Sequence, residues 1–133
     1  MEDAILVDSS VWVRHLKMTN IIEPHAVGRE VVTCPPVVQE VLQGIFHPDA
    51  YRARRRMFLL MRILDSPMSA DVFLEAADIY RNIRGKGFTI RSPNDCLIAA
   101  CAIRNGVPLL HADRDFDVIA RFTMLQAVNL SAR

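Results

Sequence analysis

Short apolar runs alternate with longer segments of helical periodicity along the chain, and this alternation constrains the fold more than any other feature of the sequence. The run Ala4–Val7 is followed, after a short turn, by Val11 and Leu16 at helical spacing. Repeated strand and helix patterns of this kind are typical of a parallel sheet with helical crossovers. We therefore expect an α/β fold with three layers, α/β/α, and a central parallel sheet of about four to five strands.

The later segments continue the same alternation. We expect strands over 30–33, 107–110 and 124–128, a very short strand at Met68, and helices over 35–46, 51–64, 69–84, 93–105 and 116–121. The clearest helix start is at Ser92, because a capping hydroxyl is followed by Pro93 at the first helical position and by the acid Asp95. Ser69 is expected to cap the helix over 69–84, and Gly85 and Gly87 are expected to end that helix.

Composition limits the classes of protein to which the chain can belong. Its 133 residues suit one domain, and a hydrophobic content of 51% argues against disorder. With 16 lysines and arginines against 15 acids, the overall charge does not indicate a nucleic-acid partner. The apolar run Ala4–Val7 is too short for a signal peptide or a membrane span, so we expect a cytoplasmic protein. The three cysteines lack zinc-site spacing and are expected to be reduced and mostly buried.

Acidic residues follow the predicted strands at the edge where parallel sheets bind ligands. Asp8 follows the first strand, Asp113 and Asp115 follow the strand over 107–110, and Asp95 and Glu40 lie in the opening turns of helices that can start at the same edge. Clustered carboxylates repel one another unless a cation or a proton neutralises them. Oxygen ligands favour Mg²⁺ or Mn²⁺, and such a site suits the hydrolysis of phosphodiester bonds.

Four segments carry a resemblance to a known family. They are LVDSSVW at 6–12, VQEVLQG at 38–44, NDCLIAA at 94–100 and DRDF at 113–116. In this order and spacing they resemble the four acidic motifs of PIN-domain ribonucleases, specifically the VapC-type toxins. The resemblance implies one PIN domain over 1–133 and a metal-dependent endoribonuclease that is the toxin of a toxin-antitoxin pair.

The resemblance also assigns roles to the acids. It implies that Asp8 and Asp95 are the main metal ligands and that Glu40 and Asp113 complete the acidic cluster. Because aspartates alternate at 113, 115 and 117, the fourth acid is ambiguous; we favour Asp113, which is nearest the strand end, and keep Asp115 in reserve. Ser10 is expected to hold Asp8 or a metal-bound water.

The same resemblance implies partners. These are an RNA substrate, a second copy of the chain in a homodimer, and a small antitoxin that wraps the toxin and obstructs the site, with no membrane. Two local features are compatible with this set. The arginines at 52, 54, 55 and 56 could hold phosphates, although a solvated helix face is their ordinary interpretation, and the apolar block over 57–61 could serve a dimer or an antitoxin helix.

Structural explanations compete with the functional ones. Asp95 alone could offset a helix dipole, and Asp8 alone could cap a helix. Glu40 lies on the apolar side of its helix, where burial without a partner is costly, so a functional interpretation is favoured for it. An ordinary structural role is favoured for His111 and for Trp12.

Two rival functions remain. A phosphatase with Asp8 as nucleophile would want an aspartate at position 10, where Ser10 stands. A non-catalytic PIN-like module that binds RNA or protein would gain nothing from unpaired carboxylates in a cleft.

Overall fold

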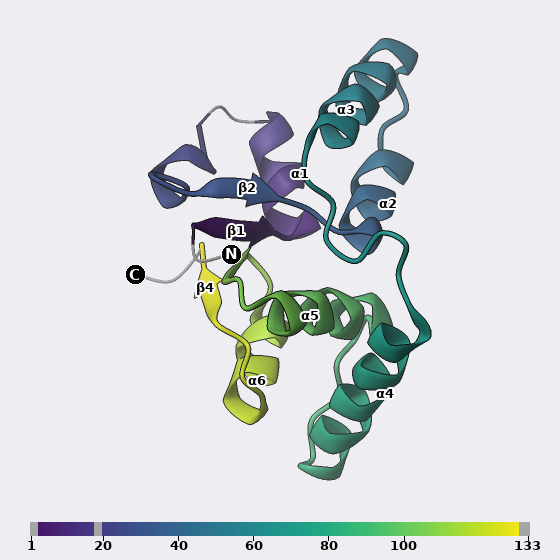
Figure 1. Cartoon of the computed structure of the whole chain (residues 1–133), viewed down its shortest axis with the longest axis vertical. Helices are drawn as coiled ribbons and strands as arrows, with labels where there is room; N and C mark the ends of the chain where they lie inside the picture. Colours follow the sequence, from purple (N-terminus) through teal and green to yellow (C-terminus); the bar gives the residue numbers. More distant parts are fainter. Residues whose placement is uncertain (1–2, 18–19, 131–133) are drawn as a thin grey trace.

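The sheet has four strands, and all of its neighbouring strands are parallel (Figure 1). The computed structural model describes residues 3–17 and 20–130. The strands are β1 (Ala4–Val7), β2 (Glu30–Val32), β3 (Leu109–His111) and β4 (Ala127–Asn129), in the spatial order β2-β1-β3-β4. The predicted parallel sheet is therefore confirmed, with the lower of the expected strand numbers.

The strand order reverses at β1. The chain passes from β1 to β2 on one side and later returns to β3 on the other side of β1. Because parallel crossovers are right-handed, this reversal puts α1 (Ser9–Lys17) on one face of the sheet and α5 (Pro93–Asn105) and α6 (Arg114–Phe122) on the other. The result is the expected three-layer arrangement. Its switch point lies at the carboxyl ends of β1 and β3, where ligands bind in such folds.

The central strand is buried on both faces. Every residue of Ala4–Val7 is buried, which explains why this segment is apolar throughout and not alternating. Trp12 of α1 packs edge-on against Phe58, and Ile98 of α5 and Phe116 of α6 are fully buried with them in one core. The structural role expected for Trp12 is thus confirmed.

Besides α5, three further helices lie on the long connection from β2 to β3. They are α2 (Pro35–Gln43), α3 (Pro48–Leu60) and α4 (Ala70–Gly85), and Figure 1 shows α3 and α4 extending to opposite ends of the molecule. A single 3₁₀ turn, Glu23–His25, precedes β2.

Several predicted boundaries on this connection are wrong. The helix expected over 35–46 ends at Gln43, with Gly44 as its C-cap, and Phe46 is fully exposed. The next helix starts at Pro48, because the His47 side chain accepts a hydrogen bond from the Asp49 amide, and it ends at Leu60 instead of 64.

The segment after α3 was also misplaced. Met68 lies in no strand; instead Ile63 forms a parallel bridge with Thr33, and the Leu64 amide donates to the Thr33 carbonyl. The predicted strand over 30–33 therefore continues as an isolated bridge beyond Val32. Ser69 and Ser92 hold the N-cap positions, but neither side chain makes a capping hydrogen bond.

The last elements occur in the predicted order. Helix α6 starts two residues before the predicted start, where the Asp113 carboxylate caps it by accepting from the Asp115 amide. Strand β3 begins at Leu109 and β4 at Ala127, both later than predicted. Cys34, Cys96 and Cys101 are free and buried, as expected. Within 3–17 and 20–130, no helix is both long and apolar enough to span a bilayer.

Replacing Gly106 by alanine will destabilise the protein by about 1–2 kcal/mol, because Gly106 ends α5 at a φ of +62°, which disfavours any Cβ. No other atom lies within 4 Å of the added Cβ, so the cost is confined to the backbone. Urea unfolding measures it. Gly85→Ala is the matched control, since Gly85 lies in a helical turn and should gain about 0.5–1 kcal/mol. Equal effects at both positions would contradict this account.

Candidate active site

Asp8 lies directly after β1 and is held by Ser10. The Ser10 amide and hydroxyl both donate to Asp8 Oδ2, at 3.0 and 2.5 Å. The same hydroxyl accepts from the Ala112 amide at 3.0 Å, which ties the end of β1 to the end of β3. The other oxygen, Asp8 Oδ1, is buried without a hydrogen-bond partner in the described part of the chain. A buried carboxylate oxygen without a partner is costly unless a cation or a proton neutralises it.

Glu40 reaches the same edge from the second turn of α2. Its Oε1 accepts from the Ser9 hydroxyl at 2.9 Å, and the residue is half-buried. The glutamate is therefore less buried than its place in the sequence pattern indicates, and its donor, the Ser9 hydroxyl, is neutral. Ser9 is a partner that the sequence pattern did not single out.

Asp95 lies in the first turn of α5 and is the least compensated acid of the site. It is 6% exposed, and its carboxylate has no hydrogen-bond donor among the residues that the structure describes. Burial, and then the neighbouring carboxylates Asp8, Asp113, Glu40 and Asp115, raise the pKa of Asp95 to about 8. Burial likewise raises the pKa of Asp8, against the opposing effect of its hydrogen bonds from Ser10.

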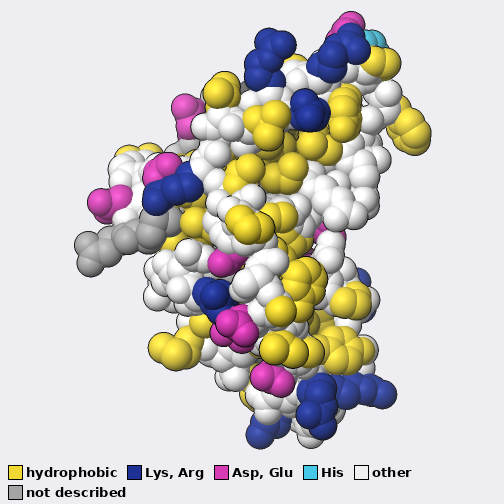
Figure 2. All heavy atoms as spheres, turned by 45° about the vertical axis from the view of Figure 1, so that its right-hand side comes forward, with side chains coloured by type: hydrophobic (Ala, Val, Ile, Leu, Met, Phe, Trp, Pro, Cys, Tyr) yellow, Lys and Arg dark blue, Asp and Glu magenta, His cyan; other side chains and the backbone are white. Residues whose placement is uncertain are grey.

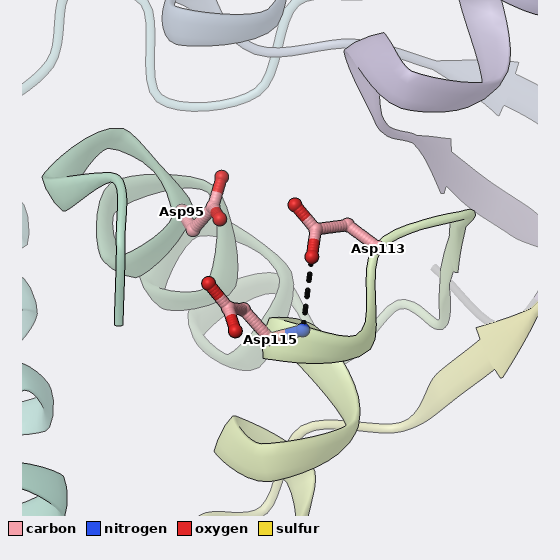
Figure 3. Close-up of side chains that lie close together, drawn as sticks. All are labelled: Asp95, Asp113 and Asp115. Atoms are coloured by element: carbon pink, nitrogen blue, oxygen red, sulfur yellow. Dashed lines mark hydrogen bonds between the residues drawn. The ribbon is translucent and has the colours of Figure 1, made fainter. Parts of the chain in front are cut away.

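Asp113 and Asp115 face Asp95 from the start of α6 (Figure 3). One oxygen from each of the three carboxylates lies within 4.8 Å of the others, which is close enough for one metal ion. Asp117 is not part of this group. It accepts from Asn129 Nδ2 at 2.7 Å, and its other oxygen lies 3.2 Å from His111 Nε2.

His111 itself lies fully buried at the end of β3. Its Nδ1 accepts from the Asp113 amide at 3.2 Å. This contact orients the turn that carries the aspartates.

Arg91 is a cation that contacts both Asp113 and Asp115. Its backbone amide and Nε both donate to Asp115 Oδ2 at 3.1 Å, and its Nη2 donates to Asp113 Oδ1 at 3.0 Å. Each aspartate is thus held through one oxygen, and the second oxygen of each is left for another ligand. The sequence analysis did not find Arg91, because a single arginine in the loop before α5 gives no pattern; only its position four residues before Asp95 could have pointed to it.

The structure therefore gathers all the predicted acids at the carboxyl edge of the sheet. Asp95, Asp113 and Asp115 form the tightest group, and Asp8 and Glu40 act on Asp95 through their charge. A donor set made only of carboxylate oxygens, with two acids of raised pKa and an unpartnered buried oxygen, fits a hard divalent cation. The arginines at 52, 54, 55 and 56 lie elsewhere, on α3, where Arg52 pairs with Asp49.

The chain resembles known proteins both in sequence and in fold. A family model described as PIN domain matches residues 5–122. Two curated relatives, VapC ribonuclease Mb1587 of Mycobacterium bovis and ribonuclease VapC11 of Mycobacterium tuberculosis, are each 40% identical over 132 residues, which cover 94% of this chain and 98% of the relative. The structure of VapBC-1 from nontypeable Haemophilus influenzae has a TM-score of 0.77 at 16% identity, covering 99% of this chain and 100% of that one.

The metal-free protein will lose stability as the pH rises from about 4 to about 8 because of Asp95. Its pKa is raised in the folded state from the ordinary 3.8 to about 8, so between these values the folded chain binds more protons than the unfolded chain, and a rise in pH favours unfolding. Thermal unfolding in chelator at pH 5–8 should show a shallower decline for Asp95→Asn than for the wild type. Equal slopes would contradict the raised pKa.

Asp115 and Asp117 should differ in metal binding although they are two residues apart. Titration calorimetry with Mn²⁺ is expected to show at least tenfold weaker binding for Asp115→Asn, because the substitution removes the negative charge of one carboxylate of the triad. Asp117→Asn is the control and should bind Mn²⁺ like the wild type, since its carboxylate pairs with Asn129. The assignment of Asp115 to the site is wrong if the two variants bind the metal equally.

Proposed function

The chain belongs to the PIN-domain family, among its VapC ribonucleases, and from this membership we propose that it is a metal-dependent endoribonuclease that hydrolyses RNA phosphodiester bonds. The single observation that carries the proposal is the meeting of Asp95, Asp113 and Asp115 at the switch point of the sheet, with Asp8 and Glu40 beside them. A binding module has no need for carboxylates whose pKa is raised by burial and by mutual repulsion. Clustered carboxylates can all be ionised at neutral pH only when a bound cation offsets their repulsion.

We assign Mg²⁺ or Mn²⁺ as that cation. Asp8, Asp95, Asp113 and Asp115 would hold it, with Glu40 completing the cluster; the triad supports Asp113 and Asp115 together in place of a choice between them. When bound, the ion supplies an activated water and neutralises charge on the phosphate oxygens.

The protein's own residues position this chemistry. Ser10 fixes Asp8 through two hydrogen bonds, so that Oδ1 remains available as a ligand. Glu40, held by Ser9, is suited to accept a proton from an attacking water. Arg91 sets the orientation of Asp113 and Asp115.

The partners that we propose are a small antitoxin protein and a second copy of the chain. The Haemophilus structure is of a VapBC pair, as is the DNA-bound VapBC of Salmonella typhimurium, which has a TM-score of 0.76 at 18% identity over 96% of this chain and 98% of that one. Figure 2 shows hydrophobic side chains over much of the face that carries α2 to α5, with lysine and arginine at both ends. Exposed apolar residues on these elements include Leu59, Leu60, Phe73 and Leu74. An antitoxin or a second copy of the chain would bury these exposed apolar side chains.

We further propose that the protein acts in the cytoplasm as the toxin of a toxin-antitoxin pair. An RNA substrate and three free buried thiols are consistent with a reducing compartment.

Purified protein, free of any co-purifying partner, should cut RNA in Mg²⁺ or Mn²⁺ and stop in chelator. Asp95→Asn and Asp8→Asn should lower the rate by at least about a hundredfold, because each removes a metal ligand. Asp117→Asn, whose carboxylate pairs outside the triad, is the matched control and should retain activity. Gel analysis of a labelled RNA mixture measures the rate. Undiminished cutting by Asp95→Asn would contradict its role as a metal ligand, and no cutting by the wild type in any metal would favour the non-catalytic module instead.

A further inference from the structure

A cavity of about 440 Å³ opens directly beside the acidic triad. It is lined by Ser10, Arg91, Ala112, Asp113, Arg114 and Asn129. Asp113 and Arg91 belong both to this cavity and to the acidic cluster, so the cavity adjoins the place where the metal ion and the scissile phosphate would lie. A group bound in the cavity could therefore belong to the same RNA strand as the scissile phosphate.

Both cations of this cavity have hydrogen-bonding capacity to spare. Arg91 uses Nε and Nη2 on the aspartates, which leaves three of its five guanidinium N–H groups, and its side chain is 65% exposed. Arg114, the first residue of α6, is exposed and forms no hydrogen bond or ion pair within the part of the chain that the structure describes.

The charges of the cavity select an anion. Its one carboxylate, Asp113, is already paired with Arg91, whereas Arg114 is uncompensated. Two guanidinium groups on one small cavity are a recognition pattern for phosphate, since arginine offers a planar fork of donors and keeps its charge at any physiological pH. In an RNA strand whose scissile phosphate lies on the triad, a neighbouring phosphate is the anion that is always present.

We propose that Arg91 and Arg114 form a phosphate-binding subsite in this cavity, which holds an RNA phosphate adjacent to the scissile one. The subsite rests on the proposed ribonuclease function and deepens it, because it gives the enzyme a contact with the strand outside the metal site. Arg91 then has two tasks: it orients Asp113 and Asp115 from one side and binds the RNA backbone from the other.

Fluorescence anisotropy with a labelled single-stranded RNA tests the subsite without relying on cleavage. The protein carries Asp95→Asn to prevent hydrolysis, and to it are added Arg91→Met, Arg114→Met or, as control, Arg29→Met. Arg29 is also exposed but precedes β2, at the opposite edge of the sheet from the acids. The two subsite variants should each bind RNA about tenfold more weakly. Each should also lower the slope of log K against log salt by about 0.7, the value of one lost phosphate contact on a single strand.

The controls decide between the subsite and simpler explanations. Arg114→Lys should restore the salt slope, because the charge returns, while Arg29→Met should leave both affinity and slope unchanged. Unchanged RNA binding in Arg114→Met, or an equal loss in all three methionine variants, would overturn the subsite. If this pattern holds but the wild type cleaves no RNA in any metal, the ribonuclease proposal fails and the subsite stands as an RNA-binding site.

Discussion

Mutual repulsion among carboxylates at the carboxyl edge of the sheet is the constraint around which the rest of this structure is arranged. The strand order brings the ends of β1 and β3 together, and the starts of α5 and α6 add their acids at the same point. Each acid is compensated differently: Asp8 by Ser10, Glu40 by Ser9, and Asp113 and Asp115 by Arg91. Asp95 has no hydrogen-bond donor among the described residues, and burial together with the neighbouring carboxylates raises its pKa to about 8.

Much of the fold could be predicted because its determinants are local or periodic. The uninterrupted apolar run of β1 and the proline and left-handed glycine at the two ends of α5 are visible in the sequence. The errors lie where tertiary contacts outweigh a local pattern. The apolar periodicity of α2 extends to Phe46 in the sequence. The helix nevertheless ends at Gln43, and the Phe46 side chain projects into solvent. No local sequence pattern indicates that Ile63, and not Met68, pairs with Thr33, because this pairing joins segments 30 residues apart.

The residues of the site likewise divide into those that local patterns predict and those that depend on tertiary contacts. Asp8, Glu40, Asp95 and Asp113 could be brought to one edge from sequence alone, since each follows a strand or opens a helix at that edge. Which of the alternating aspartates at 113, 115 and 117 faces the site could not be predicted. That choice depends on Asp113 acting as the N-cap of α6, which turns Asp115 inward and leaves Asp117 to Asn129. Arg91 was invisible for a related reason: its partners are 22 and 24 residues away, and only the folded loop aims it at them.

Asp65 shows what a structural carboxylate looks like in the same protein. It accepts from Asn105 Nδ2 at 3.0 Å and lies 3.6 Å from Arg104 Nε, so it ties the loop after α3 to the end of α5. Its charge is satisfied by the chain itself, and removing it would leave its partners unpaired. Asp95 has the opposite character, because its removal would relieve repulsion and leave no donor unpaired. A buried acid that makes the folded state less stable is expected where its charge has a use, and the use that we propose for the five neighbouring carboxylates is to hold a divalent cation against a phosphate.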